Sequence, residues 1–143
     1  MDLTATAAVT VTGFDHLVLR CADVERTLAW YTDALGLAPV RVDEWRRGTV
    51  PFPSVRVDAG TILDLIRRHG PDGHDGPDAH DTYGDGSLDH FCLVVVPTDL
   101  AELARSGAFD VVDGPGTRYG ARGDGTSLYV RDPDGVVVEL RHY

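Results

Sequence analysis

The sequence predicts an α+β fold of two tandem βαβββ modules, whose strands form a curved mixed sheet, an incomplete barrel with the helices outside. Two observations support this prediction. An apolar residue, Asp, His and further apolar residues occur at 14–19 and again at 88–93, with the two histidines 74 residues apart. Two later strand-like stretches repeat at offsets of 73 to 75, and the last one in each half carries a carboxylate. Self-similarity at a fixed spacing indicates a repeated structural unit.

Length and composition are those of an ordinary globular domain. The 143 residues allow one core, divided into a first module over 14–68, a linker over 69–87 and a second module over 88–143. The hydrophobic fraction of 43% and charged fraction of 25% are typical of such domains. The net charge of −10 argues against nucleic acid or an anionic membrane as partner, because both require a basic surface.

The chain shows no sign of secretion or of a membrane span. Residues 1–13 lack both a basic start and a continuous apolar stretch, and fit a frayed tail as well as an extra edge strand. No run approaches the roughly 20 apolar residues of a membrane helix. Cys21 and Cys92 have neither zinc-knuckle nor redox spacing and are interpreted as reduced core residues. The cytoplasm is therefore the expected compartment.

The first module is predicted to begin with a strand and a helix. Residues 14–20 alternate as a strand that places His16 on one face and Asp15 on the other. Asp23 caps the helix that follows, and Gly36 terminates it. Further strands are predicted over 37–44, 54–58 and 61–68, with a loop over 45–53.

The second module repeats this order in shorter form. A short helix is predicted over 98–107 with Thr98 as its cap, followed later by a glycine-rich loop over 114–125. The linker is dense in Gly, Pro and Asp and is expected to cross the surface. Its histidines, expected to be exposed rather than ligands, are His69, His74 and His80. The predicted strands cover 88–96, 109–113, 126–131 and 136–142.

Four polar residues lie within apolar strands: His16, Asp64, His90 and Glu139. Glu139 follows a tight turn at 132–135, and a buried ionised carboxylate needs a cation, several donors or a metal. In a curved sheet the four side chains can converge. Two imidazoles and two carboxylates suit zinc, nickel, manganese or iron and are too rich in nitrogen for a typical calcium site. A single such histidine is more often an ordinary core residue, but four coincident exceptions favour a metal.

The chain resembles the vicinal oxygen chelate superfamily, which includes glyoxalase I, extradiol dioxygenases, fosfomycin-modifying enzymes and bleomycin-resistance proteins. The matching features are Asp-His-Leu-Val-Leu at 15–19, Trp-Tyr-Thr-Asp-Ala-Leu-Gly-Leu at 30–37, and Asp-Pro-Asp-Gly at 132–135 with Glu139 four residues on. The resemblance runs from Phe14 to the C-terminus. It is specific for the superfamily and not for one activity within it.

The resemblance implies that His16, His90 and Glu139 ligate a divalent metal, with Asp64 at the fourth position. Glyoxalase-like members commonly carry glutamate there, and aspartate is one methylene shorter. Asp64 is therefore a direct ligand, a ligand through water, a base, or no participant. Glu139 and Asp64 are the candidate catalytic groups, because a carboxylate at or beside a metal can move a proton.

Three residues are candidates for contact with a small-molecule substrate. Tyr129 is one because fosfomycin-modifying relatives place a tyrosine there, although ordinary packing explains it slightly better. Arg118 and Arg122 either hold an anionic group of the substrate or, as we favour, only solvate the loop.

The expected function is a glyoxalase-like lyase or isomerase whose metal, as Lewis acid, chelates two neighbouring substrate oxygens. Two alternatives stay open: an extradiol dioxygenase using Fe(II) with two histidines and one carboxylate, and a metal-free resistance protein that binds a drug or metabolite. A fosfomycin-modifying role is disfavoured because the chain ends four residues after Glu139, without a basic C-terminal extension. The resemblance also implies a homodimer, and leaves open whether each site lies in one chain or is shared.

Overall fold

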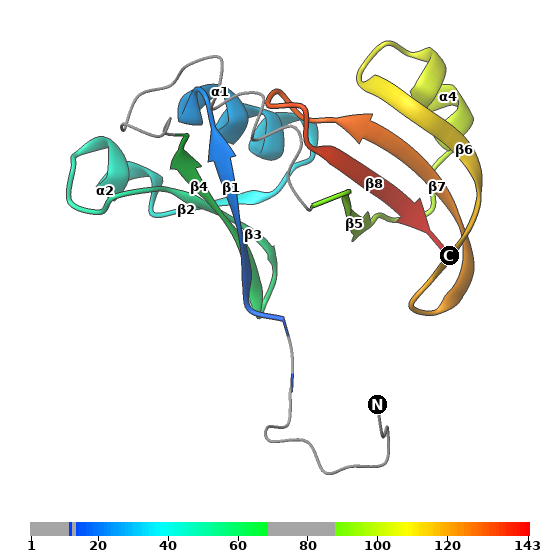
Figure 1. The fold of residues 1–143 in the computed structure, drawn as a ribbon, viewed down its shortest axis with the longest axis horizontal. Coiled ribbons are helices and arrows are strands. Elements are labelled where there is room, and N and C mark those ends of the chain that lie inside the picture. The colour runs from blue at the N-terminus through cyan, green and yellow to red at the C-terminus, as the bar shows by residue number, and fades with distance from the viewer. Residues whose placement is uncertain (1–11, 13, 69–87) are drawn as a thin grey trace.

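The computed structural model describes residue 12 and residues 14–68 and 88–143. These residues form two four-stranded mixed sheets, ordered β1-β4-β3-β2 and β5-β8-β7-β6 (Figure 1). In each sheet the first strand of the module pairs parallel with the last, and the other pairs are antiparallel. The predicted α+β fold of two βαβββ modules is confirmed, with two sheets that do not close into a barrel. The predicted linker, with its three histidines, lies outside the described residues, as do residues 1–11 and 13 of the predicted tail.

The first module follows the predicted order with one added helix. Asp23 caps α1 by accepting a hydrogen bond from the backbone N–H of Arg26, and Gly36 ends the helical stretch with a φ of +73°. The strand predicted over 37–44 is wrong beyond residue 40, because Arg41 turns into the left-handed region and a helix starts there. The elements are β1 (His16–Cys21), α1 (Val24–Ala29), the π-helical turn η1 (Trp30–Ala34), β2 (Ala38–Val40), α2 (Val42–Arg46), β3 (Ser54–Asp58) and β4 (Thr61–Arg67).

The second module differs from its prediction in two places. Asp99 and not Thr98 caps the helix, since the Asp99 carboxylate accepts from the N–H of Glu102. The glycine-rich loop predicted over 114–125 is instead the turn and flanks of a long hairpin. Residues 114–120 alternate between half-buried and exposed, which is the period of a strand. The elements are β5 (Phe91–Val94), α4 (Leu100–Arg105), β6 (Asp110–Gly120), β7 (Gly123–Arg131) and β8 (Val137–His142).

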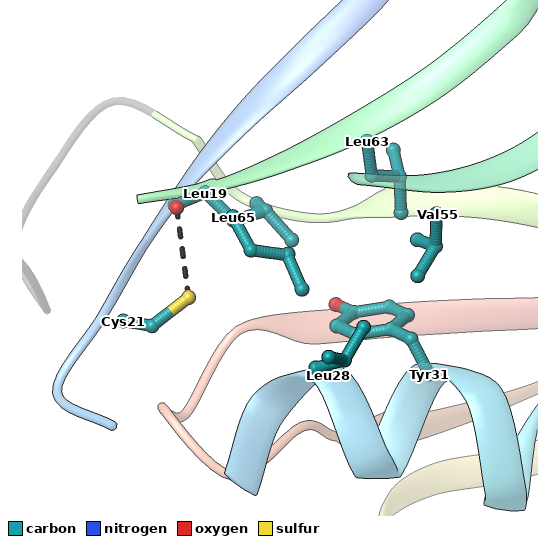
Figure 2. Packing of buried hydrophobic residues seen from close by; sticks show 7 residues of the cluster. All are labelled: Leu19, Cys21, Leu28, Tyr31, Val55, Leu63 and Leu65. Carbon is teal, nitrogen blue, oxygen red and sulfur yellow. Dashed lines mark hydrogen bonds between the residues drawn. The ribbon is translucent and has the colours of Figure 1, made fainter. Parts of the chain in front are cut away.

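Each sheet packs one apolar face against helices. In the first module, Tyr31 and Leu28 point toward the sheet residues, and the Cys21 thiol lies 3.6 Å from the Leu19 carbonyl (Figure 2). Burial raises the pKa of the Cys21 thiol to about 12. Cys92 is exposed, so its predicted place in the core is wrong. The residues that pack against both cores are Trp30, Leu35 and Phe91.

Strand alternation leaves the candidate polar residues on the sheet faces opposite these cores. In β4, Leu63 and Leu65 enter the core, and Asp64 between them points to the other face. In β8, Val138 and Leu140 enter the core, and Glu139 between them points to the other face. We call these the open faces. Among the helices in the described part of the chain, none is long and apolar enough to cross a membrane.

The turn between β7 and β8 ties the second module to α1 of the first, as their proximity in Figure 1 indicates. Asp134 accepts hydrogen bonds from the backbone N–H of Ala22 (2.8 Å) and from the Thr27 hydroxyl. Asp132 accepts one from the Tyr31 hydroxyl at 2.9 Å. Burial raises the pKa of Asp132, although hydrogen bonds from the Tyr31 hydroxyl and from the backbone N–H groups of Val136 and Asp134 oppose the shift. Polar contacts between residues about a hundred positions apart therefore help to set how the two modules sit.

Candidate metal site

The first module pairs His16 with Asp64. His16 opens β1, and its Nε2 lies 4.0 Å from Oδ2 of Asp64 on the neighbouring strand β4. Asp64 is only 7% exposed, and its other oxygen, Oδ1, accepts a hydrogen bond of 2.6 Å from the buried Ser54 hydroxyl. One carboxylate oxygen is thus fixed by the serine, while the other faces the imidazole.

The second module builds the same arrangement with His90 and Glu139. His90 Nε2 lies 3.1 Å from Glu139 Oε1. The Ser127 hydroxyl donates a 2.6 Å hydrogen bond to the other oxygen, Oε2, and Glu139 is 4% exposed. The burial is tolerable because the carboxylate has several donors around it.

Parallel pairing explains why both modules bring these residues together. Asp64 lies opposite Val18 in the register of β1 and β4, and Glu139 lies opposite Cys92 in that of β5 and β8. In each case the histidine precedes the carboxylate's partner by two residues, which places it near the same face. The sequence repeat therefore corresponds to a repeated three-dimensional arrangement.

The two pairs do not meet within one chain. Across residues 14–68 and 88–143, no group of three or more His, Cys, Asp or Glu side chains lies close enough together to hold a metal ion. The structure thus brings the four predicted ligands together only as two separate pairs, which lie on the open faces of two different sheets.

Arg141 is a further charged group at the second pair. Arg141 as a whole is 3% exposed. Its guanidinium lies 3.4 Å from Glu139 Oε2 and donates to the backbone carbonyls of Arg118 and Tyr119. The equivalent position of the first module, two residues after Asp64, is Ile66. At this matching position the first module therefore has an aliphatic side chain and the second a buried cation.

The β6–β7 hairpin leaves room for this guanidinium by means of glycine. A Cβ placed on Gly120 would lie 2.1 Å from Arg141 Nη1 and 2.5 Å from its Cζ. At Gly120 and Gly125, two of the glycines that suggested a loop, the large Arg141 side chain therefore occupies the space that a side chain would need.

Gly120→Ala is expected to displace Arg141 and lower the free energy of unfolding by about 1–3 kcal/mol, the usual cost of overpacking. Gly60→Ala is the matched control, because its Cβ would meet nothing nearer than an Asp58 oxygen at 4.0 Å. Chemical denaturation of both variants measures the difference. Equal stability of the two would show that Arg141 moves aside freely.

Two of the three predicted substrate contacts lie near the second pair. The Tyr129 ring meets that of His90 edge-on at 5.4 Å, and the Arg118 guanidinium lies 5.8 Å above the Tyr129 ring. Desolvation, followed by the nearby Glu139 charge, raises the pKa of Tyr129. Arg122 follows β6 and lies over the Tyr143 ring instead.

Sequence reasoning assigned no role to five residues that surround the pairs. Both serines and both aspartates repeat between the modules, so the repeat itself was a signal for them. Arg141 has no counterpart in the first module and no such signal. These residues are Asp15, Ser54, Asp89, Ser127 and Arg141.

Two βαβββ modules, each with a four-stranded mixed sheet, match the fold of the vicinal oxygen chelate class. A model of the Glyoxalase/Bleomycin resistance protein/Dioxygenase superfamily matches residues 13–140, and the chain belongs to this family.

Similar proteins come from several organisms. Glyoxalase domain-containing protein RDO1 of Mycosarcoma maydis is 31% identical over 137 residues, which cover 94% of this chain and 70% of that protein. Virulence protein STM3117 of Salmonella typhimurium is 28% identical over 130 residues, covering 90% and 83%. A glyoxalase/dioxygenase from Nostoc punctiforme superposes with a TM-score of 0.67 at 21% identity, covering 96% of this chain and 98% of that one, a likeness that shows the fold alone.

Proposed function

We propose that the protein is a metal-dependent enzyme whose centre uses His16, Asp64, His90 and Glu139 to hold a divalent ion such as zinc, nickel, manganese or iron. One observation carries this proposal: in both modules a serine holds one oxygen of a buried carboxylate while the other oxygen faces an imidazole Nε2. Two nitrogens and two carboxylates form a donor set that fits these metals.

The bound ion would supply Lewis acidity toward two neighbouring oxygens of a small substrate, as in glyoxalase-like isomerisation or lyase chemistry. Glu139, whose oxygen lies 3.1 Å from its histidine, and Asp64, at 4.0 Å from its own, complete the donor set, and the more distant Asp64 would also move the proton. Arg118 and Tyr129 would orient a substrate carrying a negative or planar group.

Metal content is the test of this function. The protein is purified without added metal, and bound ions are counted by elemental mass spectrometry. About one ion per complete site supports the proposal. Substoichiometric metal with tight binding of a drug or metabolite would instead indicate sequestration of the kind found in resistance proteins.

The set-back position of Asp64 favours one second candidate, an extradiol-type dioxygenase. Without Asp64 the centre has two histidines and one carboxylate, the set that leaves positions open on Fe(II). Anaerobic loading with Fe(II), followed by a catechol and oxygen, separates the candidates. Absence of oxygen uptake with every catechol tried would remove this alternative.

We further propose that the protein is a homodimer in which His16 and Asp64 of one chain meet His90 and Glu139 of the other. The two pairs lie apart in one chain, on open faces of separate sheets. Val18 and Val94 also expose apolar side chains on β1 and β5, the edge strands that flank the pairs. Exposed apolar edges of this kind favour association with another chain.

Mixing two inactive variants tests this shared site. In a heterodimer of His16→Ala and Glu139→Ala chains, one shared site loses both residues and the other keeps all four. Mixed and refolded chains are therefore expected to regain about one metal site per heterodimer, although neither variant alone binds metal tightly. Light scattering measures the mass, and calorimetry counts the sites. A monomeric mass at micromolar concentration, or no recovery on mixing, would contradict a shared site.

A further inference from the structure

The aspartates before the two histidines make the same contact in both modules. Asp15 Oδ2 lies 2.7 Å from His16 Nδ1, and Asp89 Oδ2 lies 2.6 Å from His90 Nδ1. Adjacent side chains within a strand point to opposite faces and do not touch. His16 is the first residue of β1, and His90 comes just before β5, so both aspartates lie ahead of the paired strand and can fold back.

These contacts determine which ring nitrogen carries a proton. An ionised carboxylate only accepts hydrogen bonds, so an Asp oxygen at this distance requires a proton on Nδ1. In a neutral His16, whose Nε2 has no carboxylate oxygen within hydrogen-bond distance, the lone pair then belongs to Nε2. In His90 the Nε2 proton, which Glu139 accepts at 3.1 Å, has to leave when a metal takes its place. Nε2 is the atom that faces Asp64 in the first module and Glu139 in the second.

The exposure of the aspartates argues against a role in stability. The Asp15 side chain is 89% exposed and that of Asp89 is 94% exposed. Ion pairs of such exposure contribute little to folding. Their repetition with the same atoms, 74 residues apart, indicates a role in orienting the rings.

We propose that Asp15 and Asp89 are positioning residues that hold His16 and His90 in the tautomer protonated at Nδ1, so that both imidazoles offer Nε2 to the metal. This inference rests on the proposed metal site. A carboxylate bonded to the far nitrogen of a ligating histidine fixes the ring orientation and makes the ligating nitrogen more basic.

Metal affinity of three variants tests the inference. Asp89→Ala is expected to weaken zinc binding by about 10- to 100-fold, the usual effect of losing such a partner. Asp89→Asn keeps an oxygen that accepts from Nδ1 and is expected to retain most of the affinity. Asp43→Ala removes an exposed carboxylate from α2 and is the control. Competition with a chelating dye gives the affinities, and unchanged thermal unfolding shows that the fold is intact.

Two results would overturn the inference. If Asp89→Ala binds zinc as tightly as the unaltered chain, the contact has no role in orientation. If Asp89→Asn is as weak as Asp89→Ala, the charge matters and the tautomer does not.

A second measurement needs no metal and so separates this inference from the proposed function. His16 Nε2 lies too far from Asp64 for a hydrogen bond, so Asp15 alone selects its tautomer. Long-range ¹H–¹⁵N spectra of the metal-free protein, recorded well above the usual histidine pKa of about 6.5, are expected to show His16 protonated at Nδ1. In Asp15→Ala the proton should move largely to Nε2. An unchanged spectrum would overturn the proposed role of Asp15 even in a chain that binds zinc. A chain without zinc affinity would refute only the metal site.

Discussion

Replacing Glu139 with alanine is expected to lower metal affinity more than about 100-fold and to abolish turnover, a larger loss than removal of a hydrogen-bond partner of a ligand. The carboxylate faces His90 and is held by Ser127, so alanine removes a ligand that the fold already orients. His90→Ala and His16→Ala are expected to behave alike, since each deletes a ligand from a small set. Calorimetric titration of metal into each metal-free variant measures the loss.

Glu139→Gln is the control for folding. Glutamine keeps the volume and an oxygen that can accept from Ser127, whereas alanine also leaves the Arg141 guanidinium buried beside a cavity. Weak metal binding in both variants, with normal unfolding in the glutamine one, assigns the loss to ligation. Unchanged affinity in His90→Ala or Glu139→Ala would place the metal elsewhere.

Asp64 gives a graded comparison within the same experiment. If it acts through water or as a base, Asp64→Ala should cost only about 10- to 100-fold in affinity or activity. A loss as large as that of Glu139→Ala would make Asp64 a direct ligand, despite the 4.0 Å that separates it from His16 in one chain.

The sequence repeat predicted the paired histidines and carboxylates because strand register is a local, periodic property. Once β1 lies parallel to β4, and β5 to β8, residues near the same register positions meet on one face. The Ser–carboxylate bonds follow from the same repeat, since Ser54 and Ser127 occupy matching strands.

Features that depend on distant side chains were not predictable in this way. Gly120 reads as a loop residue until Arg141, far along the chain, is seen to fill the space beside it. Arg41 gives no local sign that it turns into the left-handed region and begins a helix. The separation of the two pairs depends on how the sheets sit against each other, which periodicity within a strand does not encode.

The way the two sheets sit against each other depends in part on Asp134. Asp134→Ala is therefore expected to lower the free energy of unfolding by about 2–5 kcal/mol. The Asp134 side chain is 2% exposed and accepts from the Ala22 N–H and from the Thr27 hydroxyl, with Arg26 at 3.6 Å. Alanine leaves these buried donors without an acceptor, and each unsatisfied group costs about 1–3 kcal/mol.

Variants of the same contact show whether the stabilisation comes from the hydrogen bonds that Asp134 accepts from Ala22 and Thr27. Asp134→Asn keeps an oxygen for the Ala22 N–H and should recover most of the stability, while Asp33→Ala removes an exposed carboxylate from η1 as a control. In a double-mutant cycle, Asp134→Ala and Thr27→Val should be coupled by about 0.5–3 kcal/mol, because they remove two halves of one hydrogen bond. Urea denaturation gives the four free energies of unfolding that the cycle needs, those of the unaltered chain, the two single variants and the double variant. If Asp134→Ala unfolds within about 0.5 kcal/mol of the unaltered chain, the turn does not hold the modules together.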